Sequence, residues 1–423
     1  MKITIDHIAK IEGHMGFVGH ILKGNVSKAK LEITQGARLI EGIIIDRHHE
    51  DAPLITSRIC GVCPVVHNIC AIKAMEDALK IEVSEGVKTL RELLLIGQII
   101  QSHSLHLFFL TLPDYFKNND TIKLTEKLKK ETKQANNIRA FSDNLVEVIG
   151  GRAIHTTNTK IGGFGRLPEK EQLKKLQIES KKALEQALSL TEIFKKLPYP
   201  DFYRKTEFVS LSDPQEYAFY QGKVNASDKE PLGIRAFLPK ITEIESPLDV
   251  VKRGRYKGKS YMVGALARIN NNKNQLNPLA KQLANDFFVH KVAYNTFHNI
   301  YAQAVEMVHF LEEIDKLIDK FLKGNYSEKE IVVKQVLKPE KSAWGVGAVE
   351  APRGILFHIY KIDKQGIVRE CDIITPTAQF LENLEQDLKV FLPGLKKMTA
   401  KDRERKIKML IRAYDPCISC ATH

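Results

Sequence analysis

The sequence predicts an α+β fold that is predominantly α-helical, with a central bundle of long buried helices, a small N-terminal β portion and β-hairpin insertions. The 423 residues are 43% hydrophobic and 27% charged, which is typical of a globular protein with a large core. Apolar residues recur at helical spacing in several long segments and at strand spacing near the N-terminus. Because we find no internal repeat and no Gly/Ser-rich or Pro-rich linker, we predict one interlocked domain over residues 1–423.

The N-terminal part of the chain is predicted to change from strands to helices. Residues 1–46 are expected to form strands and tight turns, because KAKLEIT alternates polar and apolar residues and glycines stand at positions 13, 16, 19 and 24. After Pro64, a residue suited to the first turn of a helix, the apolar spacing becomes helical. A second helix at about residues 90–110 is apolar around most of its circumference, which predicts a place inside the bundle.

Later segments alternate between helices and short strands. The polar stretch 117–137 predicts a solvated helical excursion, and residues 169–196 predict an amphipathic helix ended by prolines 198 and 200. Short strands and turns are expected at about 203–269, and a long helical region from Pro278 to about residue 322. A hairpin at 364–366 is expected to join ILFHIYKI to IVRECDII.

The net charge of +13 follows from 64 Lys plus Arg against 51 Asp plus Glu, and it raises the alternative of a nucleic-acid module. The lysines are scattered over amphipathic stretches, however, and we find no helix-turn-helix, zinc-finger or aromatic RNA-binding pattern. We therefore expect a solvated lysine-rich surface that suits an acidic partner, and no nucleic acid. The start of the chain lacks the apolar core of a signal peptide, and the longest apolar run, residues 93–100, predicts no membrane span.

Four of the six cysteines form two Cys-x-x-Cys pairs, and each pair has a histidine downstream. Cys60 and Cys63 stand in RICGVCPVVH, with the histidine four residues after Cys63. Cys417 and Cys420 stand in DPCISCATH, which ends the chain at His423. The two sulfurs of such a pair can converge on one point, and thiolates select soft or borderline metals.

These pairs allow several interpretations. One pair alone could be a redox dithiol or half of a structural zinc site, and two pairs could hold zinc or an iron–sulfur cluster. Zinc modules usually place their pairs within a few tens of residues, whereas here 417 − 63 = 354 positions separate them. A site closed between the two ends of the chain favours a deeply buried catalytic metal centre.

At this point the sequence resembles the large, catalytic subunit of NiFe hydrogenases. The resemblance rests on both cysteine motifs and on KIEGH, GGRAIH and EAPRG, which occur in the order of the family from residue 3 to residue 423. It implies reversible heterolytic cleavage of H2 to protons and electrons at a centre of nickel and an iron that carries CO and cyanide. It also implies the fold of the NiFe hydrogenase large subunit, which is rich in α-helix with a small β portion.

The resemblance assigns roles to the cysteine motifs residue by residue. Cys60 and Cys417 match the terminal nickel ligands, and Cys63 and Cys420 match the thiolates that bridge nickel to iron. His67 matches the histidine that donates a hydrogen bond to a bridging cysteine and so tunes its basicity. The two remaining cysteines, at positions 70 and 371, match no ligand and are expected to be small buried hydrophobes.

Charged and polar residues of other motifs match positions around the metals. Glu12 in KIEGH matches the first proton relay beside Cys417, and a buried carboxylate of raised pKa suits that task. Arg353 in EAPRG matches the arginine over the metals, and Asp114 matches a nearby carboxylate. Cofactor-binding positions are matched by two further residues, namely Pro352 in EAPRG and Thr377, whose hydroxyl would donate to an iron-bound cyanide.

The last expectations concern a second metal and the partners. Glu41 and His423 resemble ligands of a structural magnesium or iron. Since too few cysteines remain for a cluster, an iron–sulfur small subunit is the expected electron acceptor. PTAQF resembles the cytoplasmic multimeric type, which implies further NAD(P)- or deazaflavin-linked subunits, and the end at His423 resembles the product of a maturation protease. The alternative function is a non-catalytic electron-transfer or structural subunit, related to the subunit of the quinone-reducing complex that lost its metals.

Overall fold

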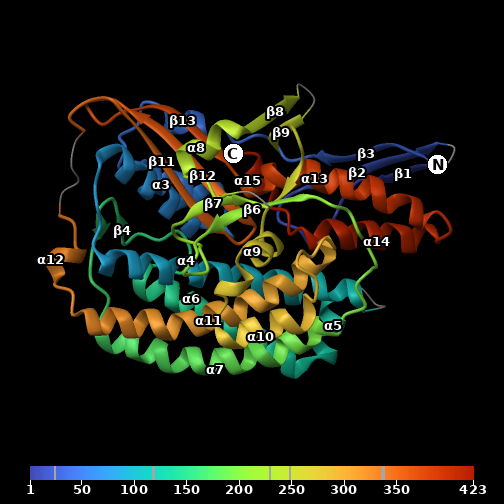
Figure 1. Cartoon of the computed structure of the whole chain (residues 1–423), viewed down its shortest axis with the longest axis horizontal. Helices are drawn as coiled ribbons and strands as arrows, with labels where there is room; N and C mark the ends of the chain where they lie inside the picture. The colour runs from blue at the N-terminus through green and yellow to red at the C-terminus, as the bar shows by residue number, and fades with distance from the viewer. Residues whose placement is uncertain (23–24, 117–119, 228–229, 247–248, 335–338) are drawn as a thin grey trace.

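The computed structural model describes residues 1–22, 25–116, 120–227, 230–246, 249–334 and 339–423. The longest helices lie together in one half of the molecule with a few shorter ones, and most of the strands lie in the other half (Figure 1). This arrangement confirms the predicted α+β class with its helical bundle, N-terminal β portion and hairpins.

Four long helices form the bundle: α4 (Glu85–Leu105), α6 (Lys129–Gly150), α7 (Lys170–Lys195) and α11 (Asn299–Gly324). Helix α11 packs on α4 and α7, and α6 packs on the same two helices (Figure 1). The segment Glu85–Tyr115 is long and apolar enough to cross a membrane, but 83% of its most apolar window is buried inside the protein. Its apolar circumference therefore fits the predicted core helix.

The N-terminal sheet is an antiparallel meander of β1 (Lys2–Ile5), β2 (Met15–Leu22) and β3 (Asn25–Ile33). Two details of the prediction for residues 1–46 were wrong. Glycines 16 and 19 lie inside β2 instead of marking turns, and a Cβ at position 16 would lie 2.7 Å from a backbone oxygen of β1. Helix α1 (Ile40–Ile44) follows the sheet where only strands and turns were expected.

A second antiparallel sheet consists of β11 (Ala343–Ala351), β12 (Gly354–Ile362) and β13 (Val368–Ile374). The hairpin between β12 and β13 confirms the prediction, whereas β11 was not predicted. Helix α3 (Pro64–Leu79), which begins at Pro64 as expected, packs on this sheet. The approach is so close that a Cβ at Gly347 would lie 2.2 Å from the carbonyl oxygen of Cys70, which explains the glycine.

Two helical predictions need correction. The region from Pro278 to residue 322 is two helices, α10 (Pro278–Phe287) and α11, because the chain leaves the bundle between them and exposes Val289. The stretch 117–137 lies partly outside the described residues, and its remainder forms α5 (Thr121–Lys127) and the start of α6. The start of α6 is not wholly solvated, since Ala135 is buried.

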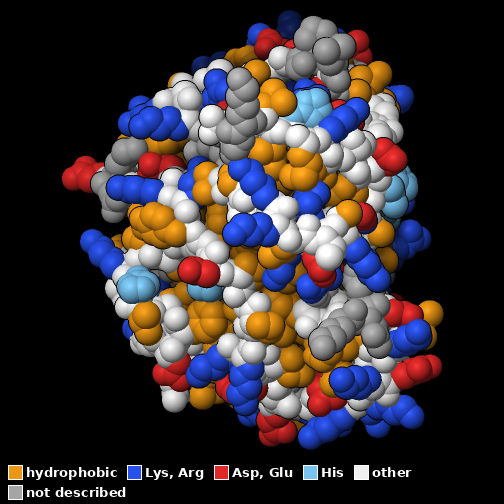
Figure 2. Space-filling model, turned by 90° about the vertical axis from the view of Figure 1, so that its right-hand side faces the viewer, with side chains coloured by type: hydrophobic (Ala, Val, Ile, Leu, Met, Phe, Trp, Pro, Cys, Tyr) orange, Lys and Arg blue, Asp and Glu red, His pale blue; other side chains and the backbone are white. Residues whose placement is uncertain are grey.

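The remaining elements connect these layers. The helices are α2 (Ala52–Thr56), α8 (Ile234–Phe237), α9 (Ala265–Asn272), α12 (Glu328–Ile331), α13 (Pro376–Phe391), α14 (Ala400–Ala413) and α15 (Ile418–Ala421). The strands are β4 (Thr159–Lys160), β5 (Gly163–Phe164), β6 (Glu207–Ser212), β7 (Lys223–Ala226), β8 (Ile241–Ser246), β9 (Asp249–Tyr256) and β10 (Tyr261–Met262). On the face seen in Figure 2, basic side chains are mixed with acidic and hydrophobic ones and form no continuous positive stripe.

Candidate metal centre

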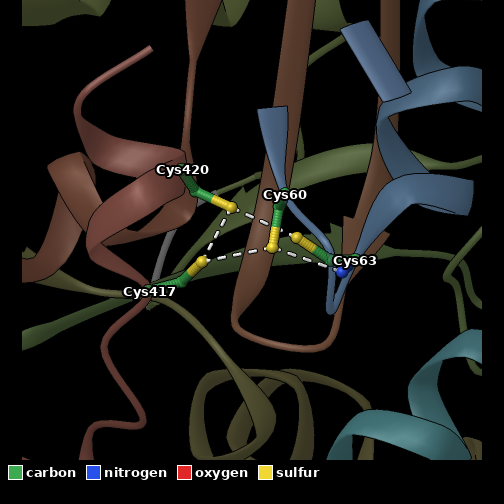
Figure 3. A group of neighbouring side chains, drawn as sticks. All are labelled: Cys60, Cys63, Cys417 and Cys420. Carbon is green, nitrogen blue, oxygen red and sulfur yellow. Dashed lines mark hydrogen bonds between the residues drawn. The ribbon is translucent and has the colours of Figure 1, made fainter. Parts of the chain in front are cut away.

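The four cysteines of the two motifs meet in the interior. Cys60 and Cys63 lie on the turn that leads into α3, and Cys417 and Cys420 lie at the two ends of the first turn of α15 (Figure 3). Their exposed fractions are between 0% and 4%, and the four sulfurs lie within 4.8 Å of one another. Two segments from opposite ends of the chain thus build one cluster of thiols.

The sulfurs are arranged in two pairs across the motifs. The distance between the sulfurs of Cys60 and Cys417 is 3.5 Å, and that between Cys63 and Cys420 is 3.1 Å. Cys417 and Cys420 are joined by a third contact of 2.9 Å. Each motif therefore supplies one member to each pair, which only an approach of the two chain ends can produce.

The electrostatics of the thiols favour a bound cation. Hydrogen bonds from Cys417 and Cys420 lower the pKa of Cys60 well below its usual value, whereas burial raises the pKa of Cys417 and Cys420. Several thiolates cannot share one buried site without a compensating positive charge. Four convergent sulfurs are a donor set for soft or borderline metal ions, so the residues fit a nickel-containing group.

Glu12 lies beside Cys417, half-buried, where the N-terminal segment bridges to the last turn of the chain. The Cys417 thiol donates to Glu12 Oε2 at 3.1 Å, and the backbone N–H of Ser419 donates to the same oxygen at 2.9 Å. The Ser419 hydroxyl donates to the other carboxylate oxygen and accepts from Gln35 Nε2 at 3.2 Å. Sequence reasoning found Glu12 but missed Ser419 and Gln35.

Arg353 follows β11 and is buried with an acidic partner that the sequence did not suggest. Its Nε donates to the backbone carbonyl of Asp415 at 2.7 Å, and its Nη2 lies 3.0 Å from the Asp415 carboxylate. Burial opposes the positive charge, but Asp415 and the neighbouring cysteines raise the pKa of Arg353 above its usual value. Asp415 has a positive φ of 53°, a strained backbone conformation two residues before Cys417.

Asp114 is buried but pairs with another arginine. Both of its carboxylate oxygens accept from Arg412 Nη1, at 2.6 and 2.7 Å. Burial raises the pKa of Asp114, and Arg412 partly offsets this effect. The carboxylate that contacts Arg353 is therefore Asp415, not Asp114, although DPCISC placed an aspartate next to the cysteine motif.

His67 lies on α3 one turn after Cys63, with 1% of its surface exposed. Its Nδ1 forms a hydrogen bond of 3.1 Å with Nε2 of His358 on β12. Among the interactions of the described residues, none joins His67 to Cys63. His358 is a further residue that sequence reasoning missed.

Pro352 and Thr377 are both buried near the cysteines or Arg353. The hydroxyl of Thr377, in the first turn of α13, accepts from the backbone N–H of Cys417 at 3.1 Å. The carbonyl of Pro352 accepts from Arg268 Nη2 at 3.1 Å. Thr377 thus contacts the cysteine motif itself, whereas Pro352, the residue before Arg353, is held by Arg268.

Glu41 and His423 lie together at the end of the chain. Their side chains are 3.5 Å apart, and His423 Nε2 lies 2.9 Å from the carbonyl oxygen of Ile373. Burial alone would raise the pKa of Glu41, but His423 and the Ile373 amide lower it below its usual value. One imidazole, one carboxylate and one carbonyl are present, which are ligands that an octahedral cation accepts.

The fold and the buried thiols define a large metal-binding subunit whose centre is closed between the two ends of its chain. The chain belongs to the nickel-dependent hydrogenase family, whose model matches residues 38–144 and 210–423. It is therefore a large-subunit hydrogenase, an enzyme that acts on H2, as the sequence motifs predicted.

Curated relatives agree with this assignment over their whole length. The alpha chain of sulfhydrogenase 1 from Pyrococcus furiosus is 37% identical over 435 aligned residues, which cover 100% of this chain and 98% of the relative. A chain of the F420-non-reducing hydrogenase vhu from Methanocaldococcus jannaschii is 30% identical, with 91% and 97% covered. The beta chain of the NAD-reducing hydrogenase HoxS from Cupriavidus necator is 27% identical, with 100% and 94% covered.

Solved structures confirm the fold. A chain of an NAD+-reducing [NiFe]-hydrogenase in the H2-reduced state superposes with a TM-score of 0.88 at 24% identity, covering 100% of this chain and 99% of that one. A Ni-Fe-Se hydrogenase from D. vulgaris Hildenborough gives a TM-score of 0.76 at 25% identity, with 100% of both chains covered. The predicted fold class is therefore confirmed both by the elements and by these neighbours.

Proposed function

We propose that this protein cleaves H2 reversibly into protons and electrons at a nickel–iron centre held by Cys60, Cys63, Cys417 and Cys420. The observation that carries the proposal is the meeting of these four buried sulfurs within 4.8 Å of one another. When bound, a nickel–iron group with CO and cyanide on the iron would supply the site at which H2 is polarised and split.

The assignment of ligands follows the sulfur pairs. Cys60 and Cys417, 3.5 Å apart, would be the terminal nickel ligands, and Cys63 and Cys420, 3.1 Å apart, would bridge nickel and iron. The resemblance of the two cysteine motifs to those of the family supports this assignment, and the contacts between the motifs are compatible with it.

Glu12 would take the proton away from the centre. Its Oε2 accepts from the Cys417 thiol, so a proton on that sulfur has an acceptor at 3.1 Å. The hydroxyl of Ser419 orients the other carboxylate oxygen. Glu12 is half-buried, which places it between the interior and the solvent.

The remaining candidate residues would position the metal ligands and set the charge around them. Arg353, fixed by Asp415, would hold a planar positive charge beside the sulfurs. Asp114 would act indirectly, by holding Arg412 in place. His67 would tune a bridging cysteine, while Pro352 and Thr377 would contact the ligands of the iron. Glu41 and His423 would hold a structural magnesium or iron ion.

Electrons would leave through an iron–sulfur small subunit. Cys70 is fully buried and Cys371 is partly buried, and these two spare thiols are too few to hold a cluster. The NAD-reducing and F420-non-reducing relatives support further NAD(P)- or deazaflavin-linked subunits and a cytoplasmic enzyme. A maturation protease as a partner during biosynthesis and a single domain over residues 1–423 complete the proposal. The hydrophobic core that joins residues near both ends of the chain supports the single domain.

Metal analysis combined with infrared spectroscopy tests the proposal. The purified complex should contain nickel and iron, show infrared bands of CO and cyanide, and reduce a dye with H2. Zinc as the only metal, without these bands, would contradict the proposal and favour a structural site. Metal-free protein that still supports electron transfer in its complex would instead favour the non-catalytic alternative.

A further inference from the structure

We propose that His358 and Tyr360 are positioning residues that fix the tautomer of His67 and thereby direct an N–H of His67 toward the cysteine sulfurs. This inference rests on the proposed function, in which those sulfurs are the metal ligands. It concerns two residues of β12 that no cysteine motif contains.

The three side chains form a continuous hydrogen-bonded row. His67 Nδ1 lies 3.1 Å from His358 Nε2, and His358 Nδ1 lies 2.7 Å from the Tyr360 hydroxyl. His358 and Tyr360 are two residues apart on β12, so both side chains point to the same face of the sheet, the face covered by α3. The exposed fractions are 1% for His67 and 0% for the other two.

Both imidazoles are neutral in this environment. Burial lowers the pKa of His67 to about 3, and burial together with the neighbouring His67 lowers the pKa of His358 well below its usual value. A neutral imidazole has one nitrogen that donates and one that accepts. The two hydrogen bonds of the row can therefore both donate toward His67 or both donate toward Tyr360. Each of these two arrangements fixes the tautomers of His67 and His358 together.

The cysteine end of the row selects the direction. Cys63 is the N-cap of α3 and His67 follows it by four residues, which places His67 about one helical turn beyond the cysteine. The negative charge of Cys60 also reaches His67, since it opposes the lowering of the His67 pKa. A ring nitrogen that faces thiolates is stabilised as an N–H and destabilised as a bare lone pair.

This condition determines every proton in the row. If His67 Nε2 carries the proton, its Nδ1 must accept, so His358 Nε2 must donate. His358 Nδ1 must then accept, and the Tyr360 hydroxyl supplies that proton. Tyr360, whose hydroxyl also contacts Thr56 and Cys371, is thus the last donor among these three side chains, and it keeps His67 in the tautomer that can donate to sulfur.

Three variants of the full, metal-loaded complex test the inference. Tyr360→Phe removes the last donor, His358→Leu removes the link, and His358→Gln keeps an N–H that can donate to His67. Tyr301→Phe is the matched control, because it removes a buried tyrosine hydroxyl that donates to the Leu283 carbonyl instead. The measurements are nickel and iron content, positions of the infrared bands of the iron ligands, and H2-dependent dye reduction.

We expect His358→Leu to lose about 10- to 100-fold in turnover, as for other groups that orient a metal ligand. Tyr360→Phe should lose less, and both should shift the infrared bands while retaining nickel and iron. His358→Gln should restore most of the turnover and the wild-type band positions, and Tyr301→Phe should match wild type throughout.

Unshifted bands in Tyr360→Phe and His358→Leu would overturn the inference, as would His358→Gln behaving like His358→Leu. If His358→Leu does not fold, the comparison of Tyr360→Phe and His358→Gln with Tyr301→Phe decides. A wild-type complex that lacks nickel or does not oxidise H2 would contradict the proposed function instead, so the two failures are distinguishable.

Discussion

Two of the buried clusters of ionisable groups in the described part of the chain differ in one respect. In the complete cluster a cation of the chain itself contacts every acidic group, and in the incomplete cluster it does not. Arg268 is bound by both oxygens of Glu306, at 2.6 and 2.7 Å, and by Glu350 at 2.8 Å, and all three side chains are 0% exposed. The four cysteines gather sulfurs that bind a metal as thiolates, and the nearby cation Arg353 already pairs with Asp415.

The difference indicates which cluster maintains the fold and which one awaits a ligand. The Arg268 cluster joins α9, α11 and β11, and Arg268 also donates to the carbonyls of Ala351 and Pro352, just before Arg353. Both of its carboxylates contact a cation that the chain itself supplies. The four sulfurs of the cysteine cluster can become thiolates together only when a cation binds, because several buried negative charges without one are unfavourable.

The largest expected effect is on the incomplete cluster. Cys417→Ala removes a proposed nickel ligand that also donates to Glu12, so we expect loss of nickel and of H2-dependent dye reduction to background. Cys70→Ala, a buried cysteine outside the cluster, is the control and should retain both. Retained activity in Cys417→Ala would favour the non-catalytic alternative.

Removing the cation of the complete cluster should affect stability more than chemistry. Arg268→Met leaves Glu306 and Glu350 buried without their partner, which costs about 3–5 kcal/mol of unfolding free energy. The control is Arg255→Met, which breaks a partly exposed pair with Glu382 and should cost less than about 1 kcal/mol. Urea unfolding measures both, and equal costs would contradict the distinction between the clusters.

Glu12→Gln tests the proton exit of the cysteine cluster. The amide keeps the shape but cannot take a proton from Cys417, so turnover and H2/D2O exchange should fall about 100-fold with nickel retained. Glu32→Gln, an exposed carboxylate on β3, should leave both rates unchanged. Loss of nickel in Glu12→Gln would mean that Glu12 is structural.

The smallest effect concerns the pH dependence of the Arg268 cluster. One cation faces two carboxylates, and burial raises the pKa of Glu350 to about 7 from a usual value of 4.5. The folded state therefore holds a proton that the unfolded state releases, so this contribution to stability falls as pH rises from about 4.5 to about 7. Urea midpoints across this range should fall less steeply in Glu350→Gln; an unchanged slope would assign the proton elsewhere.

The elements that could be predicted were those whose signal is local. Residues 170–195 follow a helical period with prolines close behind, and Pro64 begins a helix by fixing its own φ. Strand β11 was missed because AWGVGAVEA has small residues where alternation would be read. Its glycines are explained by the close approach of α3, which is a tertiary contact.

The residues of the candidate site likewise fall into those that local motifs could predict and those that they could not. The cysteine pairs and Glu12 could be found because short motifs contain them. Asp415 and His358 could not be paired with Arg353 and His67, since 62 and 291 positions separate the partners. Asp114 shows the opposite error. The sequence predicted that it lies near Arg353, but in the structure it pairs with Arg412.

The sequence by itself determined the family, the fold class and the four sulfur donors, because residue types and short spacings encode them directly. Only the tertiary structure decided which sulfurs are neighbours, which carboxylate neutralises Arg353, and that His67 is held by a histidine and a tyrosine. These are distance-dependent interactions between buried groups, and burial makes each of them strong only where the folded chain brings the partners within hydrogen-bond reach.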